Sequence, residues 1–196
     1  MKKRLGRFAL RVTGWQLGDG PPDIQKFVLI AAPHTSNWDF PYMIAMGWAF
    51  GMRIHWIGKE ALFRGPMGWL MRRLGGIAVR RGEQSGSVSS LADRFHEADE
   101  LIVVVPAEGT RKWTDHWKSG FYRIADGAGV PIVCSYLDYG TKTGGIGPPI
   151  EPSGDLSADM NVIREFYSGK RGKFPDNMGV MLLREEKSSG LRPDGQ

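Results

Sequence analysis

The segment LIVVVPAEGTR, residues 101–111, decides the fold class. Its first five residues form an uninterrupted aliphatic run that a proline ends, a pattern typical of a strand buried on both faces of a parallel sheet. The polar tetrapeptide EGTR, residues 108–111, follows almost at once. Because ligands of open α/β sheets gather at the carboxyl ends of strands, this position predicts a binding site.

The segments around this strand alternate between helix and strand patterns. Residues 85–99 carry Val88, Leu91 and Phe95 at helical spacing, and residues 120–129 are typical of a helix that ends in glycine. We predict an α/β fold with a central, mostly parallel β-sheet flanked by helices in a single domain. The expected strands are 27–33, 53–58, 75–81 and 130–140, and further helices are expected at 42–50, 65–74 and, after a break at Pro148 and Pro149, 158–167.

Length and composition agree with one folded core. The chain has 196 residues, of which 41% are hydrophobic, and a second core would leave each half marginal. We expect a basic segment over residues 1–22, a folded domain over 23–184 and a disordered tail over 185–196. The single cysteine, Cys134, excludes an internal disulfide framework and suits a reducing compartment such as the cytoplasm. A formal net charge of +5 favours an anionic partner: a phosphate-bearing substrate, an anionic membrane or nucleic acid.

The N-terminal segment reads as a basic amphipathic helix. Leu5, Phe8, Val12 and Trp15 recur at helical spacing, and no apolar run in the chain approaches the roughly 20 residues that span a bilayer. Such a helix either lies in a lipid interface or packs on the domain as an ordinary surface helix, and the sequence leaves both open. The cations on its other faces are Lys2, Lys3, Arg4, Arg7 and Arg11.

His34 and Asp39 form an H-x4-D pair directly after the expected strand 27–33. Imidazole suits general-base chemistry near neutral pH, and a carboxylate on its other nitrogen fixes the tautomer and stabilises the imidazolium. The pair therefore resembles the base and orienting acid of a catalytic triad. The spacing alone also fits an aspartate that caps a helix near an incidental histidine.

Several cations and hydroxyls could hold an anionic group near these strand ends. Arg80 and Arg81 end the expected strand 75–81, and Thr110, Arg111 and Lys118 offer donors to a phosphate. The alternatives are solvated surface cations and a weak surface pair between Glu108 and Arg111. No nucleophile elbow, Walker loop, dinucleotide fingerprint or C-x-x-C motif occurs, so we predict neither a cofactor nor a metal site, and Cys134 fits a small buried strand residue.

Four segments in order, HTSNWD, GGIAVRR, AEGTRK and GVPIV, resemble the motif blocks of the glycerolipid acyltransferases typified by 1-acyl-sn-glycerol-3-phosphate acyltransferase. The resemblance covers residues 27 to about 139 and implies a glycerol-3-phosphate acyltransferase-like fold, with residues 23–184 as the acyltransferase domain. It implies that His34 and Asp39 are catalytic. The acceptor-binding residues that it implies are Arg81, Glu108, Gly109, Thr110 and Arg111, with Arg80 and Lys118 as further cations and Pro131 on the acyl-donor side.

The implied reaction moves a fatty acyl group from a thioester, acyl-CoA or acyl carrier protein, to the hydroxyl of a lysophospholipid-like acceptor. The implied partners are the lysolipid, the acyl donor and an anionic membrane surface, with no nucleic acid and no metal, and the enzyme would lie peripherally on the inner face of the cell membrane. Arg80 and Ala107 depart from the usual motifs, which leaves other anionic headgroups open, such as an amino-acid lipid. Alternative functions are a thioester hydrolase with the same dyad and a non-catalytic basic module that binds membranes or nucleic acid.

Overall fold

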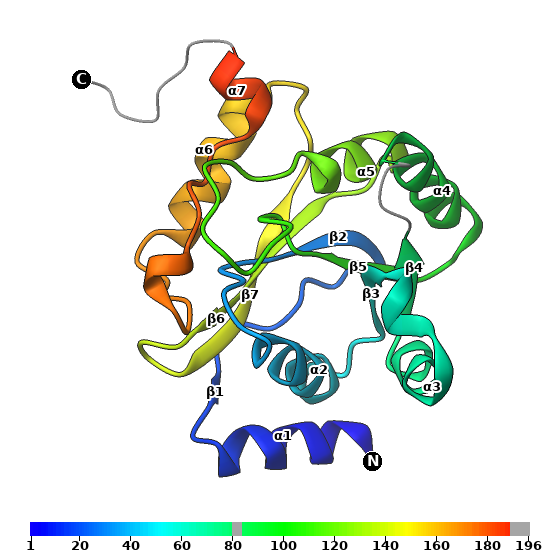
Figure 1. The fold of residues 1–196 in the computed structure, drawn as a ribbon, viewed down its shortest axis with the longest axis vertical. Helices are drawn as coiled ribbons and strands as arrows, with labels where there is room; N and C mark the ends of the chain where they lie inside the picture. The colour runs from blue at the N-terminus through cyan, green and yellow to red at the C-terminus, as the bar shows by residue number, and fades with distance from the viewer. Residues whose placement is uncertain (80–83, 189–196) are drawn as a thin grey trace.

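The computed structural model describes residues 1–79 and 84–188 (Figure 1). Its strands are β1 (Gln16–Leu17), β2 (Lys26–Ala31), β3 (Ile54–Lys59), β4 (Gly76–Val79), β5 (Leu101–Val105), β6 (Ile132–Asp138) and β7 (Thr143–Ile150). Within this described part they form one sheet in the order β1-β7-β6-β2-β5-β3-β4. Every neighbouring pair is parallel except β6 and β7. The predicted α/β fold with a mostly parallel sheet is confirmed.

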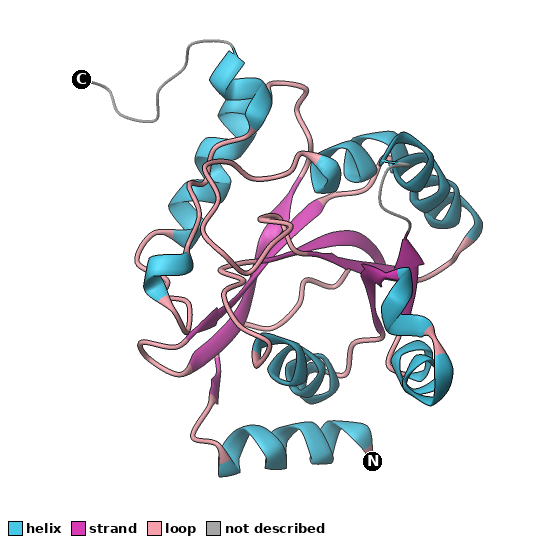
Figure 2. Ribbon diagram, in the orientation of Figure 1, coloured by secondary structure: helices cyan, strands magenta, loops and turns pink. Residues whose placement is uncertain are grey.

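Helices cover both faces of the sheet (Figure 2). They are α1 (Lys2–Val12), α2 (Asp39–Phe50), α3 (Gly65–Arg73), α4 (Gln84–Glu97), α5 (Gly120–Ala128), α6 (Leu156–Tyr167) and α7 (Arg184–Ser188), with short 3-10 turns η1 (Glu60–Phe63) and η2 (Pro175–Asn177). Helices α2 and α3 pack on one face, and α4, α5 and α6 pack on the other. The helices and strands expected from the hydrophobic pattern are present, with ends that differ by a few residues.

Strands β2 and β5 form the centre of the core. They pair in register, with Val28 opposite Val103. Successive side chains of a strand point to opposite faces, so Val28 packs with α4, α5 and α6 while Leu29 packs with α2. Both faces are therefore buried, which is why both strands read as continuous apolar runs. The carboxyl ends of β2 and β5 lie side by side, and each is followed by one of the two polar motifs.

Helix α1 packs against α2 by a close backbone approach. A Cβ atom on Gly6 would lie 2.4 Å from the carbonyl oxygen of Ala45 and 2.8 Å from the amide nitrogen of Ala49, so the contact requires glycine. Leu10, one turn further on, is also buried against α2. The N-terminal segment thus belongs to the folded domain, and β1 joins it to the sheet through β7.

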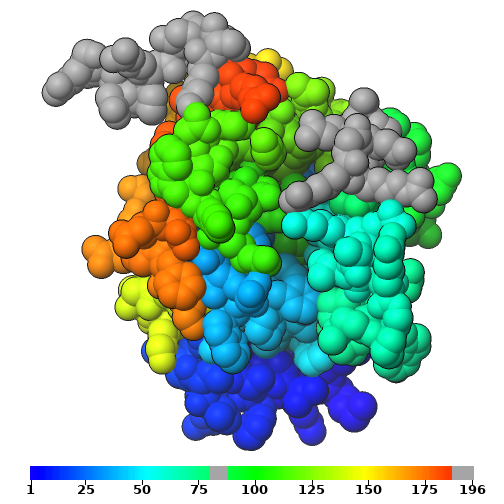
Figure 3. Space-filling view, viewed as in Figure 1, coloured from blue at the N-terminus to red at the C-terminus, as the bar shows by residue number. Residues whose placement is uncertain are grey.

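The apolar stripe of α1 faces away from the protein. Leu5, Phe8 and Val12 are 53%, 65% and 69% exposed, whereas Trp15, which follows the helix, is buried. Figure 3 shows α1, in dark blue, at the lower end of the molecule in this view. The predicted amphipathic helix is therefore present, and it packs on the domain through Gly6 and Leu10 and not through its apolar stripe.

Two segments differ from the sequence-based expectation. Pro148 and Pro149 do not break the chain, because they lie within β7. Beyond its first two residues β7 pairs only with β6 in the described structure, and proline is tolerated on such an open edge since its missing N–H breaks no ladder bond there. Residues 185–188, expected in the disordered tail, belong to α7, where Glu186 is buried against Arg164. Residues 189–196 lie outside the described residues.

Candidate active site

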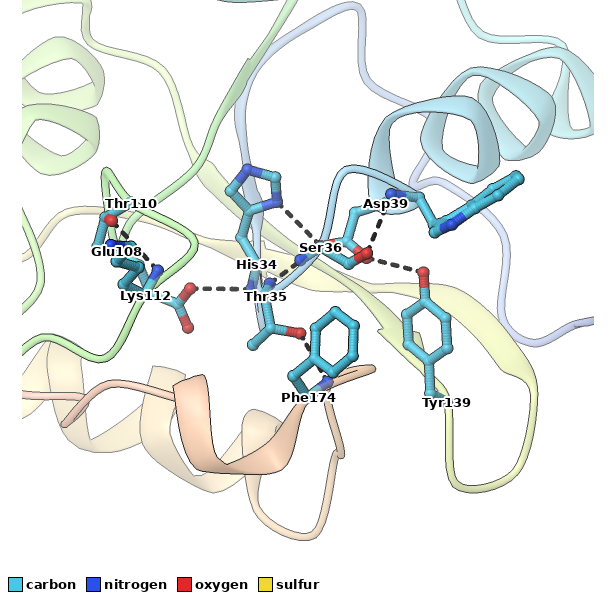
Figure 4. A network of polar contacts seen from close by, with 10 residues as sticks. His34, Thr35, Ser36, Asp39, Glu108, Thr110, Lys112, Tyr139 and Phe174 are labelled. Carbon is cyan, nitrogen blue, oxygen red and sulfur yellow. Dashed lines mark hydrogen bonds and ion pairs between the residues drawn. The ribbon is translucent and has the colours of Figure 1, made fainter.

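His34 and Asp39 meet at the carboxyl end of β2. His34 lies in the loop after the strand, and Asp39 is the first residue of α2. The imidazole Nδ1 lies 3.1 Å from the carboxylate Oδ2 of Asp39 (Figure 4). Because a carboxylate can only accept, Nδ1 carries the proton in the neutral ring and Nε2 keeps a free lone pair. This is the arrangement that a general base requires.

The carboxylate of Asp39 is buried and fully engaged. Its Oδ2 also accepts the backbone N–H groups of Thr35 at 3.0 Å and Ser36 at 2.9 Å. Its Oδ1 accepts the hydroxyl of Tyr139 at 2.8 Å. Asp39 therefore orients His34 and holds the loop before α2. It does not cap the helix, because the N-cap position is Trp38 and no side chain caps the helix there. Tyr139 was missed because a lone tyrosine after a strand carries no motif.

Glu108 supports the backbone of the same loop from the neighbouring strand end. Its carboxyl group is buried, and Oε2 accepts the backbone N–H of His34 at 2.9 Å. Burial raises the pKa of Glu108 to about 7, although the N–H and the imidazole of His34 act in the opposite direction and the carboxylate of Asp39 adds to the rise. The structure thus places this predicted acceptor-binding residue beneath the loop that carries His34.

The rest of the EGTR turn points toward the surface. Gly109 has a φ of 65°, a left-handed conformation that favours glycine and turns the chain back over Lys118. Thr110 accepts the backbone N–H of Lys112 through its hydroxyl at 3.2 Å. Arg111 is exposed and lines the cavity described below.

The other predicted cations are not all placed with the dyad. Lys118 is exposed beside Gly109, and its Nζ lies 3.4 Å from Nε2 of His116. It does not belong to the described cavity lining. Arg80 and Arg81 lie outside the described residues. The predicted grouping of Arg81 with Arg111 therefore stays a prediction.

A cavity of about 340 Å³ opens beside the dyad. Its polar lining includes His34, Asp39 and Arg111, and most of its wall is apolar. The volume lies in the usual range for small-molecule sites. The apolar wall comes mainly from β2, α2, β3 and β6 and includes Leu29, Phe40, Met43, Met46, Phe50, Met52, Ile54, Trp56, Leu62, Met71, Val104, Leu137 and Ile146.

The Trp and Met residues at positions 46, 48, 52, 56, 67, 69 and 71 divide into three groups. Met46, Met52, Trp56 and Met71 line the cavity. Trp48 packs on the core. The exposed members, both on α3, are Met67 at 57% and Trp69 at 65% exposure.

No thiol or metal site competes with the dyad in residues 1–79 and 84–188. Cys134 is buried in β6, and burial raises the pKa of its thiol to about 12, so it is a small core residue as expected. Among these residues no group of three His, Cys, Asp or Glu side chains is arranged to hold a metal ion.

A model of the acyltransferase family matches residues 19–137, more than half of the chain. This chain belongs to the acyltransferase family. The matched range contains His34, Asp39 and the EGTR turn, whereas α1 and Tyr139 lie outside it. The acyltransferase is also similar to the crystal structure of the 1-acyl-sn-glycerophosphate acyltransferase PlsC from Thermotoga maritima, with 20% identity and a TM-score of 0.57 over 88% of this chain and 80% of that chain. A search of curated protein sequences gave no significant match.

Proposed function

We propose that this acyltransferase moves a fatty acyl group from an acyl thioester to the hydroxyl of a lysophospholipid-like acceptor, with His34 as general base. One observation carries the proposal: a single cavity is lined at once by the His34–Asp39 pair, by a cationic side chain and by a long apolar wall. An acyl chain fits the apolar wall, and its carbonyl would then lie near the imidazole.

The proposed reaction needs no acyl-enzyme. Nε2 of His34 takes the proton of the acceptor hydroxyl while the oxygen attacks the carbonyl carbon of the thioester. The tetrahedral intermediate then collapses, the C–S bond breaks, and the leaving thiolate receives the proton from the imidazolium. Asp39 stabilises the imidazolium through Nδ1 between these two steps.

The acceptor class is proposed from charge and from the fold. Arg111 offers a guanidinium at the cavity, a group whose fork geometry suits a phosphate. The similar Thermotoga maritima protein is named for 1-acyl-sn-glycerophosphate, which supports a lysolipid of this class. For the donor, the apolar wall supports a fatty acyl thioester, and acyl-CoA and acyl carrier protein remain the two candidate carriers.

We also propose that the enzyme works on an anionic membrane surface, at the inner face of the cell membrane. Leu5, Phe8 and Val12 project from α1 beside its cations, the pattern of a helix that lies in a lipid interface. Within the described residues, no helix is both long enough and apolar enough to cross a bilayer. The exposed side chains of Met67 and Trp69 on α3 are further apolar groups for such a surface.

The test incubates purified protein with labelled acyl-CoA or acyl carrier protein thioester and a panel of lysolipids, and identifies products by mass spectrometry. His34→Ala should abolish transfer and leave the fold unchanged. The control is His96→Ala, an exposed histidine on α4. Transfer by His34→Ala at a near-normal rate contradicts the mechanism. Rapid hydrolysis of the thioester that continues unchanged when a lysolipid acceptor is added supports a hydrolase. Salt-sensitive binding of nucleic acid without any acyl transfer supports a non-catalytic module.

A further inference from the structure

The two oxygens of the Asp39 carboxylate have different partners. Oδ2 accepts hydrogen bonds from the imidazole of His34 and from two backbone N–H groups. Within residues 1–79 and 84–188, Oδ1 accepts only the hydroxyl of Tyr139. The side chain of Asp39 is only 8% exposed, and Tyr139 is the partner that it has on the Oδ1 side. Three donors thus hold Oδ2, and Tyr139 restrains the second oxygen of the carboxylate.

The ring of Tyr139 is itself held from three sides. Trp15 contacts it edge to face at a centroid distance of 5.0 Å, and Tyr42 of α2 lies at 6.3 Å. The ammonium group of Lys173 lies 5.9 Å from the ring centroid. These contacts come from the segment after α1, from α2 and from the segment after α6, so three parts of the chain fix one phenol.

The backbone adds a second restraint. The N–H of Tyr139 donates to the carbonyl of Arg171 at 2.9 Å, and the N–H of Phe174 donates to the hydroxyl of Thr35 at 3.2 Å. The short segment 171–174 thus joins the backbone of Tyr139 to the catalytic loop, as Figure 4 shows for Phe174 and Thr35.

We propose that Tyr139 is a positioning residue for acyl transfer, which extends the dyad to a chain of His34, Asp39 and Tyr139. The proposal rests on the proposed function of His34 as base. Tyr139 donates to Oδ1, keeps Oδ2 directed at Nδ1 of His34, and shares the negative charge of the carboxylate. Tyr139 does not belong to the described cavity lining, so it acts through Asp39 and not on the substrate.

Three titratable side chains surround the hydrogen-bonded series of His34, Asp39 and Tyr139. Glu108 lies on the far side of His34, Tyr42 lies on α2, and Lys173 faces the Tyr139 ring. Burial and the neighbouring Asp39 carboxylate raise the pKa of Tyr139 well above its usual value, so its hydroxyl remains a donor through the working pH range.

The test is Tyr139→Phe, which removes one oxygen and keeps the ring. We expect kcat to fall about tenfold or more, the order of effect of one charge-assisted hydrogen bond, with the KM of both substrates nearly unchanged. In the variant, the Asp39 carboxylate no longer shares its negative charge with a tyrosine hydroxyl and therefore stabilises the imidazolium of His34 more strongly. The acidic limb of the kcat/KM profile should therefore move to higher pH. The titration midpoint of the His34 ring, followed by NMR, should move in the same direction.

Tyr122→Phe is a matched control. Tyr122 donates to Asp159 at 2.8 Å, and Asp159 is 6% exposed, as is Asp39. This substitution also removes a buried tyrosine–aspartate hydrogen bond, but at a distance from the dyad in the fold, between α5 and α6. It should lower the melting temperature and leave kcat and the pH profile at their wild-type values.

Equal kcat, pH profile and His34 titration in wild type and Tyr139→Phe would overturn the proposal. If Tyr139→Phe does not fold, a fluorinated tyrosine is placed at position 139 instead. Its hydroxyl is a stronger donor on a ring of nearly the same size, so the titration midpoint of His34 should move to lower pH. An unchanged midpoint in this variant would also overturn the proposal. A wild-type enzyme without acyl transfer, or an active His34→Ala, refutes the proposed function instead, and the NMR titration still tests Tyr139.

Discussion

Replacing Glu108 with Gln tests the account of the buried carboxyl beneath the dyad. In the unfolded chain Glu108 loses its proton near its ordinary pKa of 4.5, whereas in the folded protein burial raises the pKa to about 7. Glutamine is nearly the same size, and its amide oxygen can still accept the N–H of His34. The substitution therefore removes the titration and preserves the contact.

The sign and size of the effect follow from proton linkage. Between the two pKa values the folded state binds a proton that the unfolded state has lost, so the contribution of Glu108 to stability is complete below pH 4.5 and disappears as the pH rises through about 7. The raised pKa corresponds to about 3 kcal/mol across this window. The free energy of unfolding of Glu108→Gln, relative to wild type, should therefore increase by about that amount as the pH rises.

Urea denaturation at a series of pH values measures this difference directly. Glu151→Gln provides the control, because Glu151 is exposed. For this variant, the plot of unfolding free energy against pH should run parallel to that of wild type. A difference between Glu108→Gln and wild type that stays constant across the window would refute the reasoning. It would mean that Glu108 is hydrated, or is stabilised as a carboxylate by a partner that the structure does not contain.

Two further predictions concern the substrates and the membrane. Arg111→Ala should raise the acceptor KM about tenfold with little change in kcat, because Arg111 would bind the ground state and the transition state equally well. The control variant Lys112→Ala should leave the acceptor KM unchanged. Steady-state kinetics with varied lysolipid concentration measures both, and an unchanged KM for Arg111→Ala removes Arg111 from the acceptor site. Leu5→Ser with Phe8→Ser should weaken sedimentation with anionic vesicles at least about tenfold through lost apolar burial, and Val162→Ser, which changes an exposed residue of α6, should not. Equal sedimentation of all variants would contradict a lipid-facing α1.

The sequence was most informative where local patterns and global packing agree. Strand β5 is an unbroken aliphatic run because it is buried on both faces at the centre of the sheet. The run itself therefore predicted the strand and its burial on both faces. The two polar motifs were placed correctly for the same reason: each follows a strand whose end is visible in the sequence, at His34 and at Glu108.

Local patterns failed where the environment of a segment, and not its composition, decides the structure. Strand β7 is rich in glycine and carries Pro148 and Pro149, so it resembles a loop, yet its place at the open edge beside β6 tolerates both prolines. The stripe of α1 was visible, but only the close approach of Gly6 to α2 shows that the stripe faces outward. A hydrophobic pattern does not state which neighbour a helix will have.

The sequence by itself determined the class of fold, the order of its elements and the position of His34 and Asp39 directly after a buried strand, because these depend on near neighbours in the chain. Only the tertiary structure decided what surrounds the pair. The bond from Tyr139 to Asp39 spans 100 residues, and the bond from Glu108 to His34 spans 74. No periodicity links such positions, because their meeting depends on how β2, β5 and β6 are ordered in the sheet.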